Sequence, residues 1–223
     1  MCSNFQAITR EHTDWISEHF QCELPFGDWE SEVYPMKPAP FIWLDDGKPR
    51  CDLANFGLIT FWAANKPRFG TRTYNARSDD GIATKPSFQN AWKRCQFGLA
   101  VMQSFYEPLW HEGKATRWRI KRSDGQPIAV ASFWERYVDH GTGELKMSFS
   151  MLTINATDHP VMQRFHAAED EKRSIVVLQH NDAYHAWLNA DQEKARGFLR
   201  LVPDHFLVCE AAPRVSPKSN DKG

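Results

Sequence analysis

Residues 117–137 read RWRIKRSDGQPIAVASFWERY and contain two apolar runs, at 117–121 and 128–137. β-Branched and aromatic side chains recur in both runs, which is typical of strands. Between them, Asp124-Gly125 is a turn signal, because glycine readily adopts the positive φ that tight hairpin turns require. The stretch therefore predicts two strands joined as a hairpin.

The same pattern of short apolar runs separated by Gly, Pro and Asp recurs along the chain. Further strands are predicted at 41–44, 53–60, 96–106, 146–154, 174–178 and 205–210. Helices are predicted at 11–20, 86–95, 157–166, 181–188 and 191–201. Strands outnumber helices without a regular alternation, which predicts an α+β fold with a single β-rich domain. We expect a curved, barrel-like antiparallel core with flanking helices.

Composition places the chain among ordinary globular proteins. Its 223 residues, 42% hydrophobic and 25% charged, are enough for one sizeable core. We expect one domain over residues 1–212, because the polar, charged tail at 213–223 predicts disorder. No apolar stretch approaches the roughly 20 residues that span a bilayer, and the N-terminus lacks the regions of a signal peptide. These features predict a cytoplasmic protein with no membrane partner.

The five cysteines are scattered along the chain and include no C-x-x-C pair. That pattern argues against a disulfide framework and against a thiolate zinc site, and it favours a reducing compartment. We therefore expect no metal and no cofactor.

Basic and aromatic residues alternate between residues 62 and 77. The net charge of −1 excludes a globally basic surface, so any nucleic-acid site must be a local patch. Cations neutralise phosphates while aromatic faces stack on bases, so the pattern suits single-stranded nucleic acid. The residues concerned are Trp62, Lys66, Arg68, Phe69, Arg72, Tyr74 and Arg77. A solvated loop whose aromatics fold back into the core is the alternative.

Cysteine is the second residue of the chain. If Met1 is removed, Cys2 presents an α-amine and a thiol on one carbon skeleton. The amine of such a 1,2-aminothiol can condense with an aldehyde, and the thiol can close on the imine to give a thiazolidine. Both groups titrate at about 8 to 8.5 in ordinary surroundings, so each is partly nucleophilic at neutral pH.

Two further residues are candidates for proton transfer. Glu107 ends an apolar run beside Tyr106 and Pro108, where partial desolvation would raise its pKa toward the range useful for proton transfer. A strand-end carboxylate that points to solvent is the alternative, and it is the more usual case. His166 lies at the end of a predicted helix, where the helix dipole favours a protonated imidazole.

With these residues in order, the chain resembles the SOS response-associated peptidase (SRAP) family from about Cys2 to Leu178. The matching elements are Cys2 with Phe5, 56–59 with Trp62, 75–78, 85–88, 105–107, 124–125, 133–136, Leu152-Thr153 with Asn155, and His166 upstream of 175–178. Two departures stand out. Ser3-Asn4 follows the cysteine where the family usually has Gly-Arg, and a longer charged segment, 167–174, follows His166.

The resemblance implies recognition of abasic sites in single-stranded DNA and covalent capture of the ring-opened sugar aldehyde as a thiazolidine, a DNA–protein crosslinking or lyase-type activity. It implies that Cys2 is the nucleophile, that Asn75 holds the amine or the sugar, that Glu107 shuttles protons and that His166 assists ring opening. The expected DNA contacts are Trp62, Arg68, Arg72, Arg77 and Thr153.

We expect a monomer that joins the nucleoid on DNA damage. Two alternatives stay open at this point. One is a cysteine-type peptidase or self-processing hydrolase that uses Cys2, and the other is a non-covalent single-stranded-DNA binding module.

Overall fold

The computed structural model describes residues 2–66 and 68–214. Met1 and the predicted tail beyond Arg214 lie outside these residues. The strands are β1 (Phe5–Ala7), β2 (Glu32–Val33), β3 (Pro38–Asp45), β4 (Lys48–Phe56), β5 (Asn75–Arg77), β6 (Phe97–His111), β7 (Lys114–Arg122), β8 (Ile128–Val138), β9 (Leu145–Asn155), β10 (Arg173–Ile175), β11 (Val177–Leu178) and β12 (Leu207–Ala211). The α-helices are α1 (Thr13–Phe20), α2 (Gln89–Lys93), α3 (Asn181–Leu188) and α4 (Gln192–Arg196). Short 3₁₀ turns are η1 (Arg10–His12), η2 (Phe61–Ala63), η3 (Phe69–Arg72), η4 (Met162–Arg164) and η5 (Asp204–Phe206).

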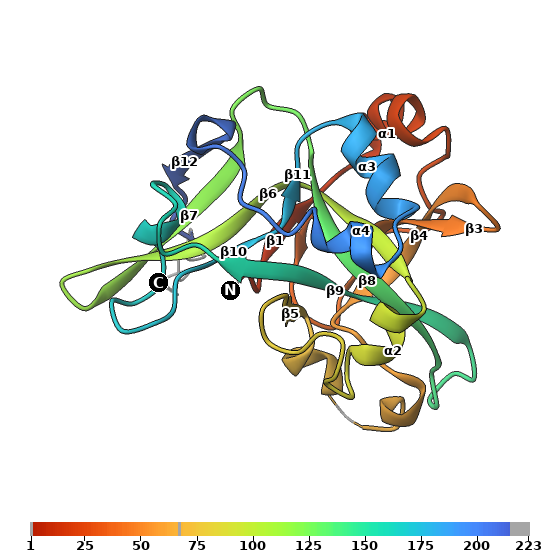
Figure 1. Ribbon diagram of the computed structural model, residues 1–223. Helices are drawn as coiled ribbons and strands as arrows, with labels where there is room; N and C mark the ends of the chain where they lie inside the picture. Colours follow the sequence, from red (N-terminus) through yellow and green to blue (C-terminus); the bar gives the residue numbers. More distant parts are fainter. Residues whose placement is uncertain (1, 67, 215–223) are drawn as a thin grey trace, which may run out of the picture.

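Strand β6 organises the sheet, because its 15 residues pair with four other strands. Along its first half it lies between β3 and β8, and along its second half between β1 and β7. The second half and β7 form a long hairpin that projects from the body of the protein (Figure 1).

The predicted hairpin between residues 117–121 and 128–137 is wrong. The turn itself forms, with Gly125 at φ +76°. However, β7 and β8 both pair with β6, one after the other, and not with each other. The turn therefore joins two strands that pair with different parts of the same neighbour. β7 pairs with the second half of β6, and β8 pairs with the first half.

Five strands close into a barrel in the order β6-β8-β9-β4-β3 and back to β6. Four of these pairs are antiparallel, whereas β4 and β9 run parallel over Ala54–Phe56 and Met147–Phe149. Aromatic rings fill the interior, where Phe149 stacks on Phe41 with centroids 4.8 Å apart and on Phe56 at 5.4 Å. The predicted β-rich α+β fold with a barrel-like core and flanking helices is confirmed, and the barrel is mixed.

The helices cover a second apolar cluster outside the barrel, and α3 and α4 lie over the β8 side of the sheet (Figure 1). Trp187 of α3 is fully buried, with its ring 4.6 Å from that of Phe97. Its Nε1 donates a hydrogen bond of 2.9 Å to the Gly98 carbonyl. None of the helices within residues 2–66 and 68–214 is long and apolar enough to cross a membrane.

The helix predicted at 157–166 is wrong, because only the 3₁₀ turn η4 forms there. The turn stops at its C-terminal end, where Phe165 is extended and forms a bridge with Leu109, and where the His166 amide donates to the Pro108 carbonyl at 2.9 Å.

At the other end of η4, the side chain of His159 lies against the start of the turn. Its Nδ1 accepts hydrogen bonds from the amides of Val161 and Met162, both at 3.2 Å, and its Nε2 lies 2.9 Å from the Val202 carbonyl. This arrangement satisfies the amides at the start of η4, as an N-cap does, and does not itself prevent a helix.

The strand predicted at 53–60 is displaced and appears as β4, which ends at Phe56. Gly57 turns the chain at φ +119°, and a Cβ at this position would lie only 2.3 Å from the Gly70 carbonyl oxygen. Only glycine permits this approach of the two backbone segments. The other predicted strands and helices each overlap an observed element.

We predict that Trp187→Ala lowers the free energy of unfolding by about 3–5 kcal/mol, because it leaves a large cavity under α3. Urea denaturation measures the effect. The matched control is Trp110→Ala on β6, whose side chain is 44% exposed, and it should cost less than about 1 kcal/mol. Equal effects of the two variants would contradict the packing of α3 on the sheet.

Candidate active site

The N-terminal segment is built into the sheet, which places Cys2 in the interior. Phe5 of β1 pairs with Phe105 of β6, and the Tyr106 amide donates to the Asn4 carbonyl at 3.0 Å. This antiparallel register continues toward Glu107 on β6. Cys2 is fully buried, and its Sγ lies 3.5 Å from the Asn4 carbonyl oxygen.

Asn75 holds the backbone of Cys2 from the opposite side. Its Nδ2 donates a 2.7 Å hydrogen bond to the Cys2 carbonyl. Asn75 begins β5, which runs parallel to β9 with Asn75 beside Met151. Its Oδ1 is buried and accepts no hydrogen bond from any residue that the structure describes. The amide group therefore has an acceptor available next to the N-terminal end of the chain.

Glu107 and His166 form a buried pair. His166 Nε2 lies 2.9 Å from Glu107 Oε2, and the two side chains are 8% and 2% exposed. A bridge between Leu109 and Phe165 brings the two segments together, and the His166 amide donates to the Pro108 carbonyl at 2.9 Å.

His166 has φ +67°, a backbone conformation that non-glycine residues adopt infrequently. It does not end a helix, so the predicted contribution of a helix dipole is wrong. Its carbonyl instead accepts a 3.1 Å hydrogen bond from Lys172 Nζ. The carboxylate of Glu107 and this fixed backbone together orient the imidazole.

Burial and the charge of Glu107 together raise the pKa of the Cys2 thiol to about 12. Desolvation is the larger cause, because a thiolate inside the barrel core loses its hydration. The thiol is therefore protonated at neutral pH. Tyr74 belongs to the same surroundings, because burial and then the charges of Cys2 and Glu107 raise its pKa. The sequence showed Tyr74 only as one aromatic of the basic segment, and its position directly before Asn75 was the available signal.

The predicted DNA contacts on the loop between β4 and β5 lie at the surface. Trp62 packs against Phe69 with ring centroids 5.2 Å apart, and Lys66 Nζ lies 4.6 Å from the centre of the Trp62 ring. Arg68 and Arg72 are exposed. Within the described part of the chain, neither forms an ion pair.

Arg77 and Thr153 lie in a network of charged side chains behind this loop. Arg77 pairs with Glu171 at 2.9 Å. Arg173 is almost fully buried and binds both oxygens of Asp79, at 2.8 and 3.0 Å, and Glu171 at 2.6 Å. Thr153 is also fully buried, and its hydroxyl accepts from Arg173 Nε at 3.3 Å. Thr153 therefore holds the Arg173 side chain, and its backbone lies beside that of Arg77 in the ladder between β5 and β9.

The structure thus brings Cys2, Asn75, Glu107 and His166 together, and it places the basic residues on adjoining elements. Sequence reasoning missed Glu171 and Arg173, because their partners lie 94 residues away along the chain, as with Asp79 and Arg173. Among residues 2–66 and 68–214, no group of three or more His, Cys, Asp or Glu side chains is arranged to hold a metal ion.

Comparison with solved structures identifies similar folds across nearly the whole chain. A protein from Bordetella bronchiseptica is 31% identical with a TM-score of 0.85, covering 96% of this chain and 100% of that chain. A protein from Bacteroides thetaiotaomicron is 18% identical with a TM-score of 0.77, covering 94% and 91%. A phage-related protein from Bordetella bronchiseptica is 14% identical with a TM-score of 0.68, covering 96% and 95%. The last two show the fold alone.

Among curated proteins, none matches the chain. The family described as SOS response associated peptidase (SRAP) matches it over residues 1–217, nearly the whole length. This match agrees with the resemblance that the sequence motifs indicate. The chain belongs to the SRAP family.

Proposed function

We propose that the protein captures abasic sites in single-stranded DNA by forming a covalent thiazolidine at Cys2 after removal of Met1. The observation that carries the proposal is the placement of Cys2. Its carbonyl accepts a 2.7 Å hydrogen bond from Asn75 Nδ2, and the residue lies beside the paired Glu107 and His166. An aminothiol with proton-transfer groups at its side has the parts that aldehyde capture needs. Family membership supports a role in the response to DNA damage.

The chemistry balances with one molecule of water released. The ring-opened sugar presents an aldehyde, and the α-amine of Cys2 attacks it to give a carbinolamine. Loss of water then forms an imine, and the thiol adds to the imine carbon while its proton passes to the nitrogen. Because burial keeps the thiol protonated, the amine is the first nucleophile, and the thiol acts only in ring closure.

Glu107 and His166 supply proton transfer in these steps. A carboxylate accepts a proton from the attacking amine, and a protonated imidazole donates to the departing water. The 2.9 Å contact between them allows the proton to pass from one to the other. Asn75 Oδ1 is placed to accept a hydrogen bond from the α-amine or from the sugar.

The DNA strand would follow the basic loop. Arg68 and Arg72 are exposed cations for phosphates, and Trp62 offers an aromatic face for a base. Arg77, supported by Thr153, would bind a phosphate next to the lesion. We also propose that the protein is a monomer with one domain over residues 1–212. It would be cytoplasmic and would associate with the nucleoid after DNA damage.

A cysteine-type peptidase is the second candidate, because the family is described by that activity. Removal of Met1 by the same pocket would be one such reaction. The raised pKa of the Cys2 thiol argues against it as the main activity, because thiolate peptidases depend on a lowered pKa.

The test is incubation with a single-stranded oligonucleotide that carries one abasic site, followed by a denaturing gel. We predict a heat-stable adduct with the native chain and none with Cys2→Ala. Cys209→Ala, which changes a half-buried cysteine on β12, is the matched control and should leave the adduct unchanged. An adduct that survives Cys2→Ala would sink the proposal.

Two other outcomes would favour the alternatives. Turnover of a peptide substrate without DNA would indicate a peptidase. Salt-dependent binding that is indifferent to the abasic site would indicate a non-covalent binding module.

A second prediction concerns the ion pair between Arg77 and Glu171. Glu171 neutralises a cation that the proposal assigns to a phosphate, so Glu171→Gln should tighten binding of undamaged single-stranded DNA several-fold at low salt. The slope of log affinity against log salt should steepen by about 0.7, the value for one more phosphate contact on a single strand.

Fluorescence anisotropy across a salt series measures both quantities. Glu210→Gln removes a carboxylate from a different ion pair, with Arg119 and Lys121, and serves as the control. Affinity and slope that stay the same in Glu171→Gln would show that Arg77 does not contact the backbone of DNA.

A further inference from the structure

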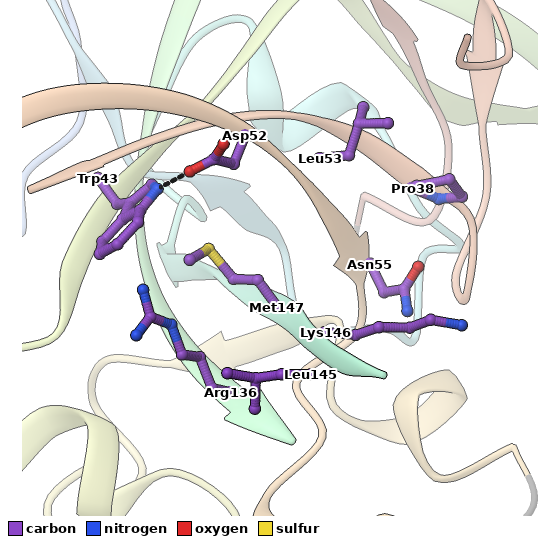
Figure 2. Close-up of a pocket in the computed structure, with 9 residues that line it drawn as sticks. All are labelled: Pro38, Trp43, Asp52, Leu53, Asn55, Arg136, Leu145, Lys146 and Met147. Carbon is purple, nitrogen blue, oxygen red and sulfur yellow. Dashed lines mark hydrogen bonds between the residues drawn. The ribbon is translucent and has the colours of Figure 1, made fainter. Parts of the chain in front are cut away.

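A cavity of about 700 Å³ opens in the barrel wall between β4 and the β8–β9 hairpin (Figure 2). Its lining comes from β3, β4, β8 and β9 and includes none of the residues assigned to the Cys2 site. Met147 in the cavity precedes Met151, the neighbour of Asn75, by four positions on β9, which is about 13 Å along a strand. The cavity is therefore separate from the proposed reaction site.

The cavity exists because β4 and β9 diverge. β4 begins at Lys48 but pairs with β9 only over Ala54–Phe56. Over Lys48–Leu53, its backbone has a strand neighbour on the β3 side alone, within the part of the chain that the structure describes. The backbone groups of this edge that point away from β3 are available to pair with an added strand, except that Pro49 has no N–H to donate.

An arginine is held in place at the cavity wall. The Arg136 guanidinium lies 4.7 Å from the centre of the Trp43 ring and 5.6 Å from that of Trp134. Figure 2 shows it directed toward Trp43, whose Nε1 donates to Asp52 at 2.7 Å. Among the described residues, no carboxylate pairs with Arg136. A guanidinium that is fixed by aromatic rings and lacks an ion-pair partner is prepared to bind a carboxylate in two-pronged geometry.

The rest of the cavity is apolar where it is deepest. Trp43 and Met147 are almost fully buried, and Leu145 at the rim is 64% exposed. This surface fits an apolar side chain next to the group that binds Arg136.

The charges around the cavity favour a single carboxylate over a polyanion. The four neighbouring carboxylates, Asp45, Asp52, Asp139 and Glu144, each pair with Arg50 or Lys146. The local charge is thus nearly balanced, whereas a nucleic-acid strand needs several unpaired cations.

We propose that this cleft docks an extended segment of a partner protein that contains an acidic residue next to an apolar one. The segment pairs with the β4 edge over Lys48–Leu53, places its carboxylate on Arg136 and packs its apolar side chain against Trp43 and Met147. The size of the cavity lies within the range of established ligand pockets. This inference does not depend on the proposed DNA chemistry, and the two sites can be occupied together.

The test is selection of peptides from a random twelve-residue phage-display library on the full-length protein. Enriched peptides should carry Asp or Glu beside Leu, Ile, Val or Phe. Synthetic copies should slow amide hydrogen exchange over residues 48–53. Arg136→Glu should weaken their binding at least about tenfold, equivalent to about 1.4 kcal/mol. Arg196→Glu is the matched control, because Arg196 also lies over an indole, 5.5 Å from the centre of the Trp92 ring, and it should bind normally.

Thermal unfolding checks that the variants are folded, and Arg136→Gln replaces Arg136→Glu if the latter is not. No enrichment, or peptides that bind Arg136→Glu and Arg196→Glu equally well, would overturn the proposal. A single-stranded oligonucleotide of thymidines that binds the native chain, is lost in Arg136→Glu and protects the same amides would also overturn it, in favour of a nucleic-acid site.

Discussion

The pairing of β1 with β6 is the constraint on which the candidate site depends. Phe5 lies beside Phe105, and the Asn4 carbonyl accepts from the Tyr106 amide at 3.0 Å. Without this register, the first residues of the chain would be free, as most termini are. With it, Cys2 lies in the interior of the domain next to Glu107, and the barrel determines what can reach the thiol.

Burial also determines the chemistry that Cys2 can perform. A thiol whose pKa is about 12 is a poor nucleophile at neutral pH. In the proposed reaction, the same burial would protect an imine formed beside the thiol from water, and the pair of Glu107 and His166 would supply the protons. These surroundings favour the amine-first order that we propose, in which the thiol acts only in ring closure. The proposed reaction requires both groups of the aminothiol.

The sequence predicted the fold class and most elements, because alternating apolar runs and turn residues are local signals. The pairing of strands was not predictable in the same way. Asp124-Gly125 correctly indicated a turn, yet β7 pairs with the second half of β6 through the tight turn at residues 112–113, and β8 pairs with the more distant first half of β6. The helix predicted at 157–166 is cut short because Phe165 and His166 bond to β6 instead, at Leu109 and Pro108. His166 and Asn75 were reached through family motifs, whereas no local pattern indicates Glu171 or the cleft at Arg136.

The candidate active site around Cys2 and the cleft at Arg136 lie on different parts of the same barrel, and β9 contributes to both. The intact mass of the protein, measured before and after incubation with DNA, tests whether Cys2 reacts as proposed. We expect a native chain that lacks Met1 and that, after incubation with abasic single-stranded DNA, gains the mass of the oligonucleotide less one water, with the modification at Cys2. A chain that retains Met1, or one whose mass stays unchanged after incubation, would contradict the proposed reaction.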